Sequence, residues 1–397
     1  MNNNRKGNAL VMQSGGCTPV INRSLAGVAR QAVDHPEIGK IIGASHGLEG
    51  LLRDEVIDLG RLSKAEWNRI AKTPAAALGS TRHKLQSDEI DAVLGSLDRH
   101  GVRFMFTIGG NDSAETGLAI SQAARHAGYD LQVMNVPKTI DNDLVLTDHS
   151  PGYGSAARFV ALATIGAGQD AQSMGQASPI TIIEVMGRDT GWLAASATLA
   201  KQRESDAPHL ICVPEVPVDE GRFLEHIEDA YRKYGFAVAV IAENTRGTAG
   251  ILGGQSDPLF VDDFGHEYFD GPARYLAGLV SQRLKVRARY EKPGTIQRSF
   301  IPSVSQVDAR EAELVGRAAV SHAVNGHSDE IVTLIREPGR DYTCNTGLAP
   351  LDQVAGQVQP MPPEYLDSAN DFVTPEFIDY ALPLVGSRLP RFSRIFH

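Results

Sequence analysis

The chain has 397 residues and a formal net charge of −10, with the apolar and charged content of a globular protein. This length predicts two lobes of roughly 150–200 residues each, and the acidic charge argues against nucleic acid as the main partner. The three cysteines form no CxxC pair, which argues against a zinc knuckle and favours free thiols. Residues 1–7 are polar and no run reaches the ~18 apolar residues of a membrane span, so we expect a soluble, cytoplasmic protein with no membrane contact.

Short apolar runs alternate with helical patterns along the chain. The first run ends in Gly15-Gly16, and a helix with Pro19 near its first turn follows. This alternation is typical of βαβ units and mainly parallel sheets. The predicted strands cover 8–12, 40–44, 102–108, 131–136, 180–186, 210–213, 237–242 and 330–335, the clearest further helices cover 89–100, 113–127, 273–284 and 312–324, and the tail from about residue 349 is expected to be irregular with short helices.

Polar, glycine-rich segments follow several of these predicted strands. In parallel sheets, ligands bind beyond the carboxyl ends of the strands, so these segments can converge on one cleft. Two segments carry glycine pairs, Gly15-Gly16 and Gly109-Gly110, and the second pair precedes Asn111 and Asp112. Glycine lets backbone N–H groups approach an anion, and oxygen-bearing side chains suit a hard cation such as Mg²⁺. A plain tight turn and a helix N-cap are the alternatives.

The segment 137–143 reads Pro-Lys-Thr-Ile-Asp-Asn-Asp and also follows a strand. Phosphoryl transfer to a hydroxyl needs a carboxylate that accepts the proton and cations that hold the spread negative charge. Asp141 or Asp143 can supply the carboxylate, and Lys138 supplies a cation. A surface turn with Asx caps is the alternative, although such a turn has no need of the lysine.

Two further segments supply arginines. Arg188 follows a predicted buried strand and suits a sugar phosphate, with an ion pair to Glu184 or Asp189 as the structural alternative. Arg289 and Arg298 bracket what we interpret as the Gly-Thr entry to a strand, and a basic surface strand is the alternative there.

Taken together and in this order, the segments resemble the phosphofructokinase family from about residue 8 to residue 298. The succession of two Gly-Gly turns, Thr-Ile-Asp-Asn-Asp, Met-Gly-Arg and Gln-Arg is more specific than any single motif. The resemblance implies an α/β fold of two Rossmann-like three-layer lobes with mainly parallel sheets and the active site in the cleft between them. It places the donor lobe at 1–148 plus a late return at about 300–350, the fructose 6-phosphate lobe at 149–300, and an irregular or helical C-terminal extension at 350–397.

The resemblance also implies a role for each matching residue. Asp141 is the expected base that takes the proton of the sugar 1-hydroxyl, and Lys138 and Thr139 are the other expected catalytic residues. The positions matched to donor binding are Gly16, Arg82, Lys84, Gly110 and Asp112, those matched to the substrate are Thr139, Asp141, Asp143, Met186, Gly187, Arg188, Glu215, Arg289 and Arg298, and those matched to the Mg²⁺ cofactor are Asn111 and Asp112.

Asp112 and Lys138 indicate the phosphoryl donor. The ATP-using branch of the family has glycine at both positions, whereas the pyrophosphate-using branch typically has Asp and Lys there. A carboxylate at position 112 would repel the α-phosphate of a nucleotide, and a lysine at position 138 can neutralise a small diphosphate. The resemblance therefore implies reversible, Mg²⁺-dependent phosphoryl transfer from pyrophosphate to the 1-hydroxyl of fructose 6-phosphate, a step of glycolysis and gluconeogenesis, in a homodimer or homotetramer.

Some positions depart from the family pattern. Asn111 stands where the commoner pyrophosphate pattern has Asp, which leaves the affinity for the metal open. Pro179 and Thr295 replace an arginine and a histidine at the sugar phosphate, and Ser299-Phe300 replaces a Gly-Gly pair. These departures leave open whether a longer sugar phosphate such as sedoheptulose 7-phosphate is also used.

Two alternative functions follow from the same residues. The first is an ATP-dependent phosphofructokinase, against which Asp112 and Lys138 argue. The second is a non-catalytic sugar-phosphate sensor or regulatory subunit, favoured by Asn111 and Thr295 but opposed by the intact base Asp141. A dinucleotide-binding dehydrogenase is set aside because no G-x-G-x-x-G follows the first strand.

Overall fold

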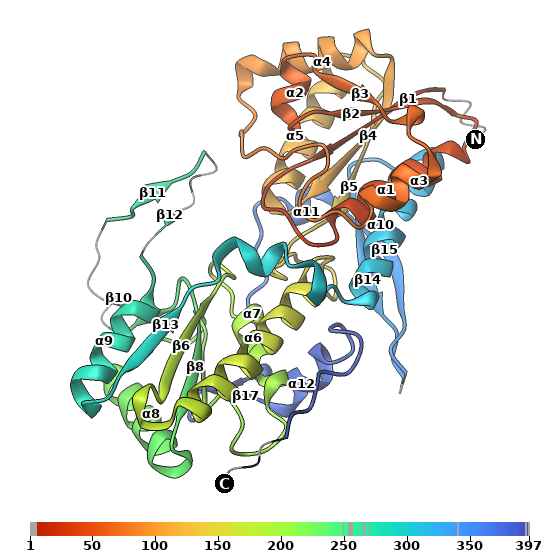
Figure 1. Ribbon diagram of the computed structural model, residues 1–397. Coiled ribbons are helices and arrows are strands. Elements are labelled where there is room, and N and C mark those ends of the chain that lie inside the picture. The colour runs from red at the N-terminus through yellow and green to blue at the C-terminus, as the bar shows by residue number, and fades with distance from the viewer. Residues whose placement is uncertain are drawn as a thin grey trace.

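The computed structural model describes residues 6–248, 250–252, 257–263, 265, 267–268, 270–339, 341–393 and 395 (Figure 1). Two separate sheets, each with helices on both faces, form the upper and lower parts of the molecule in Figure 1. None of the helices within these residues is long and apolar enough to cross a membrane.

The upper sheet has seven strands in the order β15-β14-β5-β4-β1-β2-β3. Its five inner strands run parallel, and only the edge strands β3 and β15 pair antiparallel with their neighbours. The strands are β1 (Gly7–Gln13), β2 (Ile38–Ala44), β3 (Val56–Asp58), β4 (Val102–Gly109), β5 (Gln132–Pro137), β14 (Glu330–Arg336) and β15 (Cys344–Pro350).

Both faces of the upper sheet are buried. In β1, Ala9 and Val11 pack into one core cluster and Leu10 and Met12 into another, as the alternation of side chains along a strand requires. One face is covered by α1 (Ile21–Val33), α3 (Lys64–Ile70) and α10 (Gln306–Val324), and the other by α2 (Leu48–Leu52), α4 (Ile90–Arg99), α5 (Asn111–His126) and α11 (Leu351–Val354).

The lower sheet has four parallel strands in the order β13-β6-β8-β7. These are β6 (Ile180–Val185), β7 (Leu210–Cys212), β8 (Ala237–Ala242) and β13 (Ala288–Glu291). One face packs against α6 (Tyr153–Met174), α7 (Trp192–Ala195) and α12 (Pro375–Ala381), and the other against α8 (Glu220–Tyr234) and α9 (Pro272–Leu284).

Short elements connect these layers. The pair β11–β12 projects from the lower part beside the upper part in Figure 1. The two-residue strands are β9 (Arg246–Gly247), β10 (Gly250–Ile251), β11 (Phe260–Val261), β12 (Glu267–Tyr268), β16 (Leu366–Asp367) and β17 (Phe372–Val373), and the 3₁₀ helices are Leu59–Arg61, Ser87–Glu89, Gly175–Ala177, Ser196–Ala200, Gly294–Arg298, Ile301–Ser303 and Pro363–Tyr365.

The predicted fold class is confirmed, because two α/β parts with mainly parallel sheets are present. The chain returns to the upper sheet through α10, β14 and β15, and then runs down to α12 on the lower part (Figure 1). The exact lobe limits stay predictions. The strand entry expected at Gly294-Thr295 is wrong, because a φ of 55° at Gly294 turns the chain into a 3₁₀ helix after β13.

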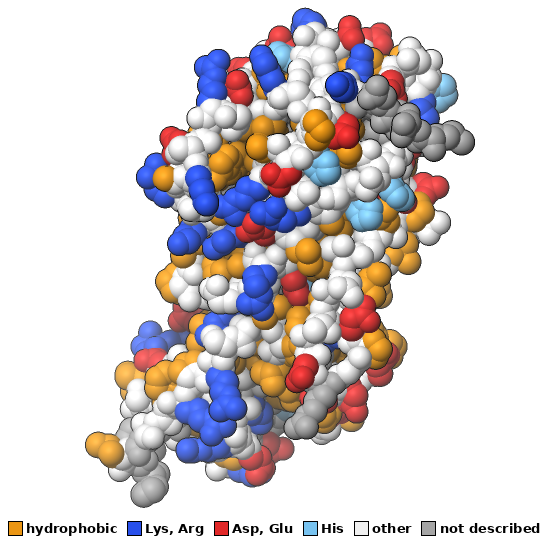
Figure 2. All heavy atoms as spheres, turned by 90° about the vertical axis from the view of Figure 1, so that its right-hand side faces the viewer, with side chains coloured by type: hydrophobic (Ala, Val, Ile, Leu, Met, Phe, Trp, Pro, Cys, Tyr) orange, Lys and Arg blue, Asp and Glu red, His pale blue; other side chains and the backbone are white. Residues whose placement is uncertain are grey.

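Charged side chains are mixed on the face that Figure 2 shows. Lys and Arg side chains form separate groups on both the upper and lower parts, with Asp and Glu side chains among them. On the visible described residues, this face therefore lacks the continuous basic stripe of a nucleic-acid-binding surface.

Candidate active site

A cavity of about 390 Å³ lies where the two parts of the molecule meet. Its walls come from the segments that follow β1, β4 and β5 in the upper sheet and β6, β8 and β13 in the lower one. Ligand sites at the carboxyl ends of parallel strands are the rule in such folds. The predicted site residues that line it are Gly16, Arg82, Gly110, Asn111, Asp112, Lys138, Thr139, Asp141, Asp143, Met186, Arg188 and Arg298.

Lys138 holds a buried positive charge against the first glycine turn. Its Nζ donates a hydrogen bond to the carbonyl oxygen of Gly16 at 2.6 Å. Burial lowers the pKa of Lys138 to about 8. A Cβ atom on Gly15 would lie 3.2 Å from Nζ, and Gly15 has a φ of 76°, so glycine suits this turn both sterically and conformationally.

The amino end of α5 brings oxygen atoms to the cavity. The N-cap residue is Gly110, with no side-chain cap, so the alternative of an Asp or Ser N-cap does not hold. Asn111 donates from Nδ2 to Asp143 Oδ2 at 3.3 Å, while its buried Oδ1 has no hydrogen-bond partner within the described structure. An unsatisfied amide oxygen close to the carboxylate of Asp143 fits the all-oxygen ligand set that Mg²⁺ prefers.

The loop after β5 presents two carboxylates. The Asp141 N–H donates to Thr139 Oγ1 at 3.1 Å, and Asp141 Oδ2 lies 3.7 Å from Arg188 Nε. Asn142, with a φ of 59°, lies between the two aspartates and is buried outside the cavity wall. Burial, together with the charge of Asp141, raises the pKa of Asp143 to about 6.

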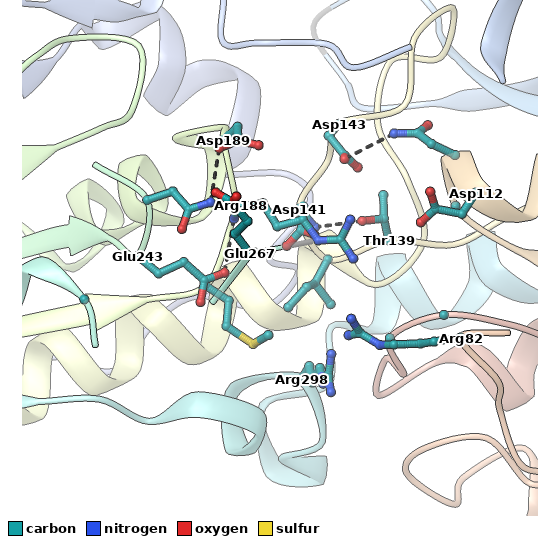
Figure 3. Close-up of a pocket in the computed structure, with 18 of the residues that line it drawn as sticks. Arg82, Asp112, Thr139, Asp141, Asp143, Arg188, Asp189, Glu243, Glu267 and Arg298 are labelled. Atoms are coloured by element: carbon teal, nitrogen blue, oxygen red, sulfur yellow. Dashed lines mark hydrogen bonds and ion pairs between the residues drawn. The ribbon is translucent and has the colours of Figure 1, made fainter. Parts of the chain in front are cut away.

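Figure 3 shows how these side chains face one another. Asp141, Thr139 and Arg188 lie at its centre, with Asp143 above them and Arg82 and Arg298 below in this view. The carboxylate of Asp141 therefore lies amid cationic side chains that come from different elements.

The backbone at Gly187 and Arg188 is unusual. Gly187 has a φ of 140°, and a Cβ there would lie 2.7 Å from the carbonyl oxygen of Thr190. Arg188 itself has a φ of 52°. Glu184 forms its ion pair with Lys292 at 2.7 Å rather than with Arg188.

Glu243 is a cavity residue that the sequence interpretation missed. It follows β8 directly, and its Oε1 accepts a hydrogen bond from the Arg188 N–H at 3.2 Å. Burial, and then the charge of Asp141, raise the pKa of Glu243 to about 7. The signal was available, because Glu243 comes directly after a buried apolar strand, as the segments with site residues do.

Four predicted residues do not line the cavity. Lys84 pairs with Glu115 at 3.4 Å, and Arg289 pairs with Asp170 at 2.9 Å. Glu215 Oε1 instead accepts hydrogen bonds from the backbone N–H groups of Gly191 at 3.0 Å and Met361 at 2.9 Å. Gly187 is the fourth, and it adjoins two residues that do line the wall, Met186 and Arg188.

Known proteins resemble this chain over nearly its whole length. The family model described as phosphofructokinase matches residues 8–323. The pyrophosphate–fructose 6-phosphate 1-phosphotransferase of Xanthomonas campestris is 38% identical over 390 residues, which cover 97% of this chain and 93% of that protein. The structure described as pyrophosphate-dependent phosphofructokinase from Nitrosospira multiformis superposes with a TM-score of 0.89 at 33% identity, covering 98% of this chain and 95% of that one. The corresponding structure from Marinobacter aquaeolei gives a TM-score of 0.87 at 35% identity, covering 98% and 94%. The chain therefore belongs to the phosphofructokinase family.

Proposed function

We propose that this protein transfers a phosphoryl group reversibly between pyrophosphate and the 1-hydroxyl of fructose 6-phosphate. The observation that carries the proposal is the position of Asp141, in a cavity whose wall contains Lys138 on one part of the molecule and Arg188 on the other. The names of the similar proteins from Xanthomonas, Nitrosospira and Marinobacter support the same reaction.

In this proposal Asp141 accepts the proton of the attacking 1-hydroxyl. Lys138 and Arg82 offset the negative charge of pyrophosphate, and Thr139 orients Asp141 by accepting its backbone N–H. Catalysis then consists mainly of positioning and electrostatic stabilisation, as phosphoryl transfer requires. Asn111 and Asp112 would hold Mg²⁺, which when bound neutralises part of the phosphate charge.

The acceptor occupies the side of the cavity formed by the lower part. Arg188 and Arg298 bind the sugar phosphate, and Met186 contacts the sugar. We assign the binding of sugar hydroxyls to Glu243 rather than to Glu215, which the family resemblance matched to the substrate, because Glu243 lines the cavity and Glu215 does not. A carboxyl group whose pKa is about 7 can both donate and accept hydrogen bonds to sugar hydroxyls near neutral pH.

Pyrophosphate rather than ATP is the proposed donor. Asp112 and Lys138 both line the cavity, and the Lys138 ammonium at Gly16 provides a compact basic position suited to a small diphosphate. We further propose a cytoplasmic homodimer or homotetramer, with a donor lobe of residues 1–148 and about 300–350 and an acceptor lobe of 149–300.

The conservative variant Asp141→Asn tests this function. Removing the base should lower kcat for fructose 1,6-bisphosphate formation by roughly 10²–10⁴-fold, while calorimetry should still detect binding of fructose 6-phosphate. Asp91→Asn, on the exposed surface of α4, is the matched control and should leave both quantities unchanged. A wild-type protein that bound the sugar phosphate without turning it over would support the sensor function instead.

A further inference from the structure

The C-terminal segment reaches the loop that carries Asp141 and Asp143. After α11 the chain runs from the upper part down to α12, which packs on the core of the lower part (Figure 1). Within α12, the buried side chain of Tyr380 contacts the loop through its hydroxyl group. This contact joins two segments that are 238 residues apart in the sequence.

The Tyr380 hydroxyl bonds to the loop at two points. It accepts a hydrogen bond from Asn142 Nδ2 at 2.8 Å and donates one to the carbonyl oxygen of Asp148 at 2.9 Å. Asn142 Oδ1 in turn accepts from the Ser150 N–H at 3.0 Å. One hydroxyl thus ties the residue between the two aspartates to the far end of the same loop. Burial raises the pKa of Tyr380 well above its ordinary value, so the hydroxyl keeps the proton that it donates.

The ring of Tyr380 is itself held firmly. Trp192 and Tyr365 lie with their ring centroids 5.3 Å and 5.6 Å from that of Tyr380. Arg336 donates to the Tyr380 carbonyl oxygen at 3.0 Å, lies 4.7 Å from the ring centroid, and pairs with Asp148 at 3.0 Å. Neighbouring rings and Arg336 therefore hold Tyr380 on several sides, so the loop is bonded to a closely packed side chain.

A second hydrogen bond from the C-terminal segment reaches the loop at Asp143. The Gln359 N–H donates to the carbonyl oxygen of Asp143 at 2.8 Å, and the Gln359 carbonyl accepts from Trp192 Nε1 at 3.1 Å. The C-terminal segment therefore contacts the loop at Asn142 and at Asp143, on either side of the peptide bond that joins them.

The loop needs such support because of its backbone. Asn142 has a left-handed backbone conformation, and its side chain lies outside the cavity wall while Asp141 and Asp143 line the cavity. A buried amide that lost its acceptor would carry an unsatisfied N–H group, and the loop would shift to find another partner. Because catalytic geometry tolerates little displacement, such a shift should affect turnover before it affects binding.

We propose that Tyr380 is a positioning residue for phosphoryl transfer, whose hydroxyl fixes Asp141 and Asp143 through Asn142. The inference rests on the proposed function, because it concerns the base of that reaction. Tyr380 contributes geometry to the site without touching a substrate.

The test compares Tyr380→Phe with Tyr365→Phe. Both substitutions remove one hydroxyl from the same aromatic cluster, but only the Tyr380 hydroxyl bonds to the catalytic loop. Tyr380→Phe should lower kcat roughly tenfold or more, with the KM values for pyrophosphate and fructose 6-phosphate within about twofold of wild type. Tyr365→Phe should match wild type in all three constants.

A second pair of variants approaches the contact from the loop. Asn142→Gly permits the φ of 59° but removes the amide, and should reproduce the loss in kcat. In the double variant Tyr380→Phe/Asn142→Gly, the fold loss in kcat should be smaller than the product of the two single losses, because both changes break the bond between Tyr380 and Asn142. If Tyr380→Phe does not fold, as judged by its Tm, Asn142→Gly alone decides the matter.

The outcomes separate this inference from the function on which it rests. A wild-type protein without pyrophosphate-dependent turnover overturns the proposed function itself. An active wild type with an unchanged kcat in Tyr380→Phe overturns the positioning role. An equal loss in Tyr365→Phe, or a raised KM with unchanged kcat, overturns it too, because either result points to general packing or binding.

Discussion

Gly16 and Arg298 face each other across the cavity, so closely that a Cβ atom on Gly16 would lie 2.6 Å from Arg298 Nη1. Gly16 follows β1 of the upper sheet, and Arg298 ends the 3₁₀ helix after β13 of the lower one. The donor turn and a sugar-phosphate arginine of the proposed site are therefore in direct contact, and the absence of a side chain at position 16 sets where the guanidinium can lie.

Gly16→Ala should weaken acceptor binding. The new methyl group displaces the end of the Arg298 side chain rather than the backbone, so the fold should persist while the KM for fructose 6-phosphate rises about tenfold, the loss of about one charged hydrogen bond. Steady-state kinetics and a thermal melt check this. Gly278→Ala, in α9, where a Cβ meets nothing within 4 Å, is the control and should leave the KM unchanged.

Asp262 should compete with pyrophosphate for Arg82. The two side chains form an ion pair that links the β11–β12 arm to the upper part. Asp262 and pyrophosphate are both anions that would bind the guanidinium group of Arg82. Asp262→Asn should therefore lower the KM for pyrophosphate several-fold and leave the KM for fructose 6-phosphate unchanged. The exposed neighbour Asp263 provides the control variant Asp263→Asn. A higher KM in Asp262→Asn would mean that the pair orients Arg82 instead of occupying it.

Deprotonation of Lys138 should lower the kcat/KM for pyrophosphate at alkaline pH. Because its pKa is about 8 in the protein, the ammonium is present below that pH and is lost above it. The kcat/KM for pyrophosphate reports the free enzyme, so it should decline above about pH 8. In Lys138→Gln the value should be low and should lack this decline. A wild-type profile that stays flat to pH 9.5 would contradict the proposed charge neutralisation.

His149 should link stability to pH. Its Nδ1 and Nε2 lie 2.8 Å from carboxylate oxygens of Asp148 and Glu311 respectively. Burial alone would lower the pKa of His149, but these hydrogen bonds raise it to about 9 from 6.5. The folded-state pKa is therefore the higher one, so the stabilisation is complete below about pH 6.5 and is lost as the pH rises through 9. Its size is roughly 3 kcal/mol at most.

Urea unfolding at pH 6.5 and pH 9.5 measures this loss. The free energy of unfolding should fall more between the two pH values for wild type than for His149→Gln. The variant should still lose some stability, because other groups titrate at alkaline pH in both proteins. Equal falls in the two proteins would contradict the linkage.

The sequence predicted the strands that form continuous apolar runs. The glycine turns after β1 and β4, and the acidic loop after β5, were placed because each follows a continuous apolar strand. The long helix α6 was not specified, because eleven of its residues are buried and its Ala, Gly and Thr content leaves no polar stripe. The edge strand β15 was missed because Cys344–Pro350 mixes polar and apolar residues with a central glycine.

A site residue could be predicted from the sequence where two conditions coincide: its side chain has suitable chemistry, and it lies just after a predicted strand. Asp141, Lys138 and Arg188 satisfy both conditions, and the structure brings them to one cavity. Glu215 came from the resemblance alone, whereas Arg289 was also singled out in a basic segment whose alternative was a surface strand. Contacts with other residues hold both side chains outside the cavity. The role of Tyr380 could not be foreseen, because a contact across 238 residues leaves no trace in local sequence.

The donor assignment is tested most directly by assaying fructose 6-phosphate phosphorylation with Mg²⁺ and either pyrophosphate or ATP, in wild type and in Asp112→Gly/Lys138→Gly. We expect turnover of the wild type with pyrophosphate and not with ATP, and loss of pyrophosphate use in the double variant. Turnover with ATP alone would contradict the roles of Asp112 and Lys138, although Asp141 could still act as the base.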